Sequence, residues 1–160
     1  EVIVASSNSK NFGLYRERAG AVTVVTENTG AVEASASQIV ATAREIYSVP
    51  PAHGAALVAM VLDDAVLREE WSVELTQMRD RINGLRNLLS EKLKQKDVDR
   101  DFSFIREEKG MFSFLGLTVE QVQKLINEYS IYLVNSSRIN VAGINQKNID
   151  YLINSIAAVL

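Results

Sequence analysis

A lysine near the start of the sequence is the first residue that could do chemistry. Lys10 lies in a polar, hydroxyl-rich stretch that follows the apolar run Val2 to Ala5. Such a run predicts a strand, and ligands of a parallel sheet bind beyond the carboxyl ends of its strands. A lysine there can form a Schiff base when partial burial and nearby cations free its amine of the proton. Ser7 and Arg18 could together hold a phosphate. From spacing alone, an ordinary solvated lysine is the more frequent case.

Further strands and helices are predicted around this loop. A second strand runs from Ala21 to Thr26, and both strands are near-continuous apolar runs, which are typical of strands buried on both faces of a parallel sheet. A helix from about Val32 to Tyr47, with Ala and Ser on its close-packed face, ends before Pro50, because proline lacks a backbone donor. Ala55 to Asp63 predicts another helix. Buried strands need neighbours on both sides, so we expect a substantial N-terminal portion to be missing.

The longest predicted helix runs from about Ala65 to Lys94. Its apolar side chains recur at alternating steps of four and three residues, which places them on a single stripe. They are Trp71, Leu75, Met78, Ile82, Leu85 and Leu89. A helix of this length commonly bridges two domains, although one arm of a helical hairpin or coiled coil would show the same stripe.

A charged linker, Lys94 to Asp101, precedes a smaller α+β unit. The strands predicted in this unit are Phe102 to Ile105, Met111 to Leu117, Ile131 to Val134 and Arg138 to Ala142. Thr118 and Gln121 have the spacing of a capping box, which predicts a helix from Val119 to Tyr129. Asn145 is expected to cap a final helix. The apolar face of that helix is Ile149, Leu152, Ile153, Ile156 and Leu160.

Composition excludes several classes of function. The chain has 160 residues, a formal net charge of -3 and no cysteine. The weak negative charge argues against a nucleic acid or an anionic membrane as partner, because both require concentrated lysine and arginine. The lack of cysteine excludes disulfides and thiolate metal sites and favours the cytoplasm. The longest strongly apolar run, Ala55 to Leu62, is too short to span a bilayer.

Four segments, in order, resemble those of a known enzyme family. The string from Ser6 to Gly20 (SSNSKNFGLYRERAG) is similar to the cofactor-lysine segment of aspartate and aromatic aminotransferases, which are fold type I pyridoxal-phosphate enzymes. Tyr47 to Ala55 (YSVPPAHGA), Gly110 to Phe114 (GMFSF) and Ser137 to Gly143 (SRINVAG) match three further segments. The likeness covers the whole chain, which is thereby identified as resembling the C-terminal portion of such an enzyme.

The resemblance implies an α/β fold in three parts. Residues 1–64 would belong to the large cofactor-binding domain, residues 65–96 would form the long interdomain helix, and residues 97–160 would form the small α+β domain. The implied activity moves an amino group between an amino acid, either aspartate or glutamate or an aromatic one, and a 2-oxo acid. The implied cofactor is pyridoxal 5'-phosphate, and the implied location is cytoplasmic.

The resemblance also assigns roles to single residues. Lys10 would bind the cofactor as a Schiff base and move the proton between the substrate Cα and the cofactor. Ser7 and Arg18 would bind the cofactor phosphate. Arg138 would bind the substrate α-carboxylate, and Phe112 would help line the pocket.

The same comparison makes Arg44 the partner of the distal carboxylate of a dicarboxylic substrate. In the family this arginine reaches into the active site of the other subunit, so it implies a homodimer. Without the resemblance, Arg44 would be a helix-surface arginine and Arg138 equally well a strand-end ion pair. Val49 stands where the family pattern has Asn or Ser, which puts a strict preference for aspartate in doubt.

Several groups that the family needs have no candidate in this sequence. They are the acidic residue at the pyridine nitrogen, the tyrosine on the phenolic oxygen, the stacked aromatic ring and the phosphate-binding turn, all of which precede the lysine segment in the family. We therefore expect the chain alone to be a poor or inactive catalyst. Two other functions stay open. One is a lyase or decarboxylase of the same fold, against which the two substrate arginines argue, and the other is a non-catalytic assembly module.

Overall fold

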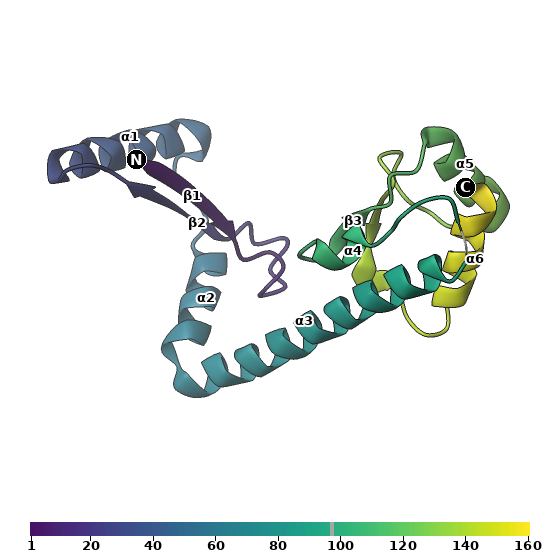
Figure 1. Cartoon of the computed structure of the whole chain (residues 1–160). Coiled ribbons are helices and arrows are strands. Elements are labelled where there is room, and N and C mark those ends of the chain that lie inside the picture. The colour runs from purple at the N-terminus through teal and green to yellow at the C-terminus, as the bar shows by residue number, and fades with distance from the viewer. Residues whose placement is uncertain (97) are drawn as a thin grey trace. The chain divides into compact units, whose positions relative to one another are not determined.

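The computed structural model describes residues 1–96 and 98–160. The chain divides into two compact units, Glu1–Leu75 and Thr76–Leu160, which we call unit 1 and unit 2 and describe separately. Its elements in chain order are β1 (Val2–Ser7), β2 (Gly20–Val25), α1 (Thr29–Tyr47), α2 (His53–Asp63), α3 (Ala65–Lys94), α4 (Phe104–Glu107), β3 (Phe112–Phe114), α5 (Val119–Tyr129), β4 (Arg138–Asn140), the 3-10 turn η1 (Val141–Gly143) and α6 (Ile149–Val159) (Figure 1). Among the described residues, no helix is both long enough and apolar enough to cross a membrane.

Unit 1 is built on β1 and β2, which pair only with each other in the described chain. The pairing is antiparallel, with Val2 opposite Val25 and Ser7 opposite Gly20, so the prediction of a parallel sheet is wrong. The physical reason is the connection: parallel neighbours need a crossover, usually a helix, whereas residues 8–19 form an irregular loop that returns the chain directly. Gly20 permits the close approach, since a Cβ there would lie 2.3 Å from the Ser6 carbonyl oxygen.

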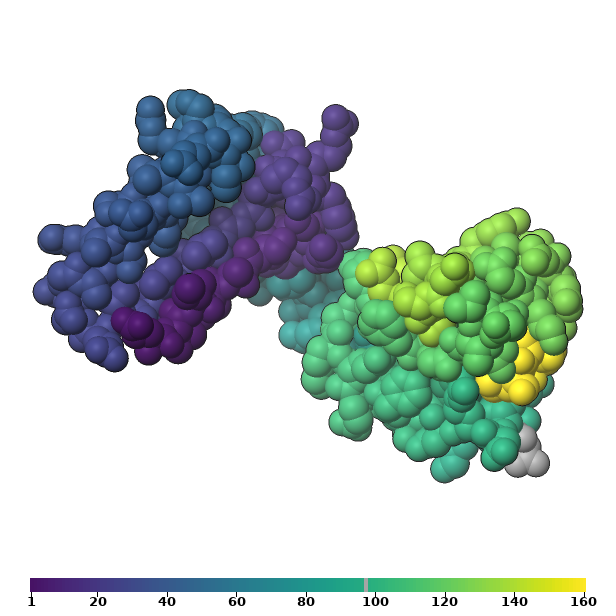
Figure 2. Space-filling view, turned by 90° about the horizontal axis from the view of Figure 1, so that it is seen from above, coloured from purple at the N-terminus to yellow at the C-terminus, as the bar shows by residue number. Residues whose placement is uncertain are grey.

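The predicted burial of these strands on both faces is also wrong. Ile3 leaves 73% of its surface exposed, and Val22 leaves 61%. In Figure 2 the dark purple atoms of β1 lie uncovered on the face in view. The apolar sequence of both strands is therefore present without a described segment to bury it.

The helices of unit 1 follow the predicted order. α1 begins at Thr29, earlier than predicted, because the Asn28 side chain caps it by accepting a hydrogen bond from the Ala31 N–H at 3.0 Å. None of its residues is buried, so the expected close-packed Ala and Ser face is not observed in this unit. α3 has the predicted bounds, and the Asp64 carboxylate starts it by accepting from the N–H groups of Val66 and Leu67.

Unit 2 encloses a core. Its buried apolar side chains are Leu89, Leu93, Phe102, Ile105, Leu115, Leu117, Val122, Leu125, Val141, Ile144, Ile149, Ile153, Ile156 and Val159. The part of α3 that lies in unit 2 contributes to this core through its apolar stripe, except that Met78 stays 46% exposed. The predicted capping box of α5 is confirmed: Thr118 Oγ1 accepts from the Gln121 N–H, and the Gln121 side chain accepts from the Thr118 N–H.

Two predicted strands of unit 2 are wrong. Around Phe102 to Ile105 the chain forms the short helix α4 instead, after the Asp101 carboxylate has accepted hydrogen bonds from the Ser103 N–H and Oγ. Residues 131–134 are irregular. Ile131 and Leu133 pack against the core, so their alternation with polar residues reflects one-sided burial rather than strand pairing.

The last two elements differ from prediction in detail. β4 ends at Asn140, whose side chain accepts from the Ala142 N–H and so turns the chain into η1. The cap position of α6 is Asn148 rather than Asn145, although the Asn145 side chain accepts from the Asn148 N–H one turn earlier. At its end, Val159 is buried and Leu160 is 41% exposed, because the helix stops before Leu160 can turn inward.

Candidate functional site

The loop that carries Lys10 follows β1 directly. Lys10 is exposed, and its Nζ lies 5.6 Å from the centroid of the Tyr15 ring, a cation–π geometry. The loop is closed at its base by the Asn8 N–H, which donates to the Ala19 carbonyl oxygen at 3.0 Å. The Phe12 N–H donates to the Asn8 carbonyl oxygen at 3.3 Å, so the chain turns sharply around Lys10. The amine therefore projects from a turn rather than from a strand.

The two predicted phosphate ligands flank the same loop. Ser7 Oγ accepts from the Ser9 N–H at 3.2 Å and donates to Ser9 Oγ at 3.1 Å. Arg18 has a left-handed backbone, with φ of 52°, and its Nη1 donates to the Tyr15 carbonyl oxygen at 2.9 Å. Lys10 and Arg18 thus both contact Tyr15, on its ring and on its carbonyl. A primary amine, a hydroxyl and a guanidinium on one loop form a donor set that fits an aldehyde bearing a phosphate.

Arg44 lies on α1, outside this loop. It occupies the last turn of α1, where its carbonyl oxygen accepts from the Ser48 N–H at 3.0 Å. Its side chain is exposed, as that of a helix-surface arginine is. Within unit 1, no described contact joins it to Lys10, Ser7 or Arg18.

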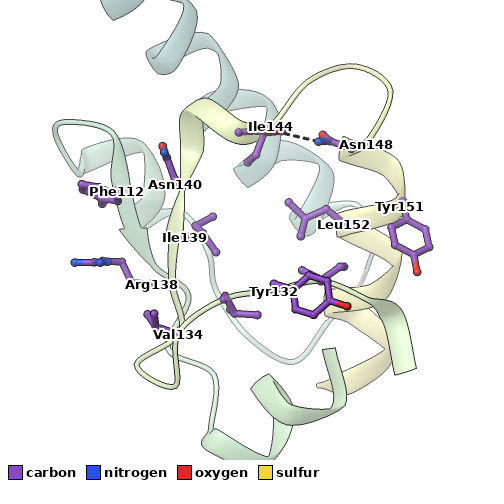
Figure 3. A pocket seen from close by; sticks show the side chains of 13 residues that line it. Phe112, Tyr132, Val134, Arg138, Ile139, Asn140, Ile144, Asn148, Tyr151 and Leu152 are labelled. Atoms are coloured by element: carbon purple, nitrogen blue, oxygen red, sulfur yellow. Dashed lines mark hydrogen bonds between the residues drawn. The ribbon is translucent and has the colours of Figure 1, made fainter. Parts of the chain in front are cut away.

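In unit 2 the structure brings Arg138 and Phe112 together. β3 and β4 pair antiparallel, with Phe114 opposite Arg138, and the Arg138 guanidinium carbon lies 4.8 Å from the centroid of the Phe112 ring. Figure 3 shows both side chains on one side of the strand pair, whereas Ile139 points to the other side, toward Leu152. The ring orients the guanidinium while its forked N–H groups stay exposed, which suits a carboxylate.

These two residues border an open hollow of about 690 Å³. Its other walls come from the segment 131–134, from β4 and from α6, including Tyr132, Val134 and Tyr151 (Figure 3). The lining is mainly apolar, with Arg138 as its one cation among the described residues. Arg138 and Phe112 lie at the margin of this hollow, whereas Ile139 and Leu152 face into it.

Sequence reasoning missed Arg86, whose side chain binds the backbone at the start of β3. The Arg86 side chain is 1% exposed, and its Nη2 donates to the carbonyl oxygens of Gly110 and Phe112, both at 2.7 Å. Its Nη1 donates to Glu108 Oε2 at 3.2 Å and to Ser113 Oγ. The available signal was its position four residues after Ile82, on the apolar stripe of the helix, where a charge needs partners.

The Arg81 side chain forms hydrogen bonds with the segment that follows β4. Both of its terminal nitrogens donate to the Ala142 carbonyl oxygen at 3.1 Å, and Nη2 also donates to the Ile144 carbonyl oxygen at 3.0 Å. Arg81 lies outside the apolar stripe of the helix, and its position in the sequence gives no sign of these carbonyl partners.

Known proteins similar to this chain share one enzymatic class. The family of class I and II aminotransferases matches residues 1–156. An aspartate aminotransferase from Haemophilus influenzae is 56% identical over 160 residues, which are 100% of this chain and 40% of that protein. An aromatic-amino-acid aminotransferase from Pseudomonas aeruginosa is 44% identical over 159 residues, which are 99% of this chain and 40% of that protein.

A solved structure gives the same result for the fold. It is the crystal structure of an aromatic-amino-acid aminotransferase from Burkholderia pseudomallei covalently bound to pyridoxal phosphate. Its TM-score to this chain is 0.90 at 48% sequence identity, and the match covers 99% of this chain and 40% of that one. The chain thus spans about 40% of the length of the relatives that it matches.

Proposed function

This chain belongs to the family of class I and II aminotransferases, and from that premise we propose that it serves the transfer of an amino group between an amino acid and a 2-oxo acid. The observation that carries the proposal is the segment from Ser7, the last residue of β1, to Arg18, which presents a hydroxyl, an amine and a guanidinium at the end of one strand and in the loop that follows it. The roles proposed for the remaining residues follow from the resemblance to this family.

The cofactor that this loop would hold is pyridoxal 5'-phosphate, which when bound supplies an electron sink for the bond broken at the substrate Cα. Lys10 would be its covalent attachment point and, once displaced by the substrate amine, would take the proton from the substrate Cα and deliver it to the cofactor. Ser7 and Arg18 would hold the phosphate, because hydroxyl and guanidinium donors match its oxygens. The covalently bound cofactor of the Burkholderia pseudomallei relative supports this assignment.

Arg138 and Phe112 would form the substrate end of the site. The exposed guanidinium of Arg138 would bind the α-carboxylate in a bidentate pair, and the Phe112 ring beneath it would fix its orientation. Arg44 would bind the distal carboxylate of aspartate or glutamate from the second subunit of a homodimer, which its exposed place on α1 permits. Relatives named for aspartate and for aromatic substrates support both substrate classes. The proposed location is cytoplasmic.

A second candidate function rests on the exposed surfaces of unit 1. Neither β1, β2 nor α1 contains a buried residue, although the sequences of β1 and β2 are mainly apolar. A chain with such surfaces fits a non-catalytic assembly fragment of the same family, in which Lys10 would be an ordinary loop lysine. This alternative predicts association without selective cofactor attachment.

The test is to map where pyridoxal phosphate attaches. The purified chain is incubated with the cofactor and treated with borohydride: the lysine amine condenses with the aldehyde, water leaves, and hydride reduces the resulting C=N bond to a stable secondary amine. Mass spectrometry then locates the adduct. Lys10→Ala is the test variant, and Lys147→Ala, which removes an exposed lysine of unit 2, is the matched control.

The proposed function predicts a dominant adduct on Lys10 that is lost in Lys10→Ala and kept in Lys147→Ala. Labelling spread over exposed lysines such as Lys94, Lys96 and Lys147, unchanged by Lys10→Ala, would overturn the proposal for this chain and favour the assembly fragment.

A further inference from the structure

A tryptophan distant in sequence holds the two residues that follow Lys10. Trp71 lies in α3, and its Nε1 donates to the Asn11 carbonyl oxygen at 2.7 Å. Its indole stacks on the Phe12 ring, with 4.7 Å between centroids and 14° between planes. One side chain thus restrains the backbone of one residue and the side chain of the next, both within unit 1.

We propose that Trp71 is a positioning residue for Lys10, which it keeps at the turn by anchoring Asn11 and Phe12. The inference rests on the proposed function, in which Lys10 carries the cofactor. The indole is suited to this task because its flat face restrains a ring and its single N–H restrains a carbonyl, at a low cost in side-chain entropy.

The loop is anchored again near its other end. His53 Nδ1 pairs with Glu17 Oε2 at 2.9 Å, and a Cβ at Gly54 would lie 2.7 Å from the Glu17 Cβ, so the start of α2 packs tightly against the loop. Lys10 and Arg18 are exposed beside these anchored residues. Trp71 acts on the side of the loop that bears Lys10, where the Gly13 N–H also donates to the Lys10 carbonyl oxygen at 3.4 Å.

Asn11 makes the anchor sensitive to change. Its side-chain Oδ1 is buried and has no hydrogen-bond partner among the described residues. Removal of the indole N–H would take the donor from its carbonyl oxygen as well, and unpaired buried oxygens favour local opening of the segment. Two variants separate the contributions: Trp71→Phe keeps a ring but loses the donor, and Trp71→Leu loses both.

The first measurement needs no cofactor. Trypsin cleaves after Lys10 only when the turn opens, so the cleavage rate there reports the open population. Cleavage after Arg44 and Arg68, in the same unit, serves as internal reference. The control variant is Val73→Ala, on the same helix and 47% exposed in the native chain. We expect cleavage after Lys10 to rise about fivefold in Trp71→Phe, as for one lost hydrogen bond, and further in Trp71→Leu.

The second measurement uses pyridoxal phosphate and borohydride on the same variants. The share of adduct on Lys10 is expected to fall severalfold in Trp71→Leu, less in Trp71→Phe and not in Val73→Ala, while total labelling stays constant. A merely structural role would instead raise cleavage equally at all three sites.

The outcomes separate the inference from the proposed function. Unchanged cleavage after Lys10 in Trp71→Phe, or a parallel rise after Arg44 and Arg68, overturns the positioning role whatever the labelling shows. If Trp71→Leu fails to fold, the Phe variant still decides. Unselective labelling of the native chain contradicts the proposed function but leaves the cleavage result to decide on Trp71.

Discussion

The two units hold their candidate residues in different ways. In unit 2, Phe112 and Arg138 lie on a short strand pair backed by a closed apolar core and by the buried Arg86. In unit 1, Lys10 lies on a loop whose neighbouring strands leave their apolar side chains exposed, and it is held by single contacts such as that of Trp71. A site can therefore be supported by a core or by individual anchors, and the two supports differ in what a single substitution removes.

The largest effect is expected from the buried charge of unit 2. Arg86→Met removes the guanidinium that donates hydrogen bonds to Glu108, to Ser113 and to three backbone carbonyl oxygens. We expect a loss of roughly 4 kcal/mol in the free energy of unfolding of unit 2, since buried and part-buried acceptors lose a charged donor, at about 1–3 kcal/mol for each acceptor left unpaired. Urea unfolding followed by circular dichroism measures it. Arg79→Met, an exposed arginine of α3, is the control.

The Arg86 prediction also has a local part. Amide hydrogen exchange of Gly110 to Phe114 should accelerate more than that of α5, because the guanidinium binds that segment directly. If Arg86→Met and Arg79→Met have the same free energy of unfolding, the buried charge of Arg86 does not stabilise unit 2, and the contrast drawn between the two units is wrong.

A pair of matched substitutions compares the two units directly. Ile153 is 2% exposed in the core of unit 2, whereas Ile3 is 73% exposed in β1. Ile153→Ala should lower the free energy of unfolding by about 3 kcal/mol, because it removes buried methyl groups and leaves a cavity. Ile3→Ala should change it by about 0.5 kcal/mol or less. Urea midpoints of both variants test this, and a larger loss from Ile3→Ala would mean that β1 is buried in solution.

A smaller effect is expected at the start of α5. Thr118→Ala removes the side-chain oxygen that accepts from the Gln121 N–H and should cost about 1 kcal/mol. Thr118→Ser keeps the oxygen and is the control. If both variants lose the same stability in urea unfolding, the missing methyl group rather than the cap is responsible.

The smallest effect is a pH dependence at Asp101. Hydrogen bonds from the Ser103 side chain and then from its N–H lower the pKa of Asp101 below its ordinary value of 3.8. A lowered folded pKa gives stability that is present above the ordinary value and is lost as the pH falls through the folded one. Ser103→Ala should raise the pKa of Asp101, as carboxyl NMR titration will show. The free energy of unfolding of Ser103→Ala should be lower than that of the native chain near neutral pH, and the two values should converge at low pH.

Local signals in the sequence were sufficient for several elements. The capping box of α5 and the bounds of α3 were predicted correctly, because side chains within a few residues determine a helix start and an apolar stripe. Strands were harder: residues 131–134 alternate because one side packs on the core, and no spacing in the sequence distinguishes that from pairing. The direction of pairing of β1 and β2 was wrong for the same reason, since apolar runs do not specify a partner.

The candidate site shows the same limit. The family motif that suggested Ser7, Lys10 and Arg18 covers the end of β1 and the loop after it, where the chain turns sharply. The contacts that support the site join residues far apart in the sequence, and no motif predicts them. Trp71 meets Asn11 across sixty residues of chain, and Arg86 meets Phe112 across twenty-six. Such contacts depend on how the helices pack, and this packing cannot be predicted from the spacing of residues in a single sequence.

The anchor at Asn11 and Phe12 also gives the molecule a built-in optical probe. Trp71 is the sole tryptophan of the chain, so its fluorescence reports the surroundings of the Lys10 loop, while unit 2 contributes none of that emission. A red shift of the emission that precedes the loss of helical signal on heating would record the release of this loop while the helices persist. The loop can thus be followed in solution without attaching any label.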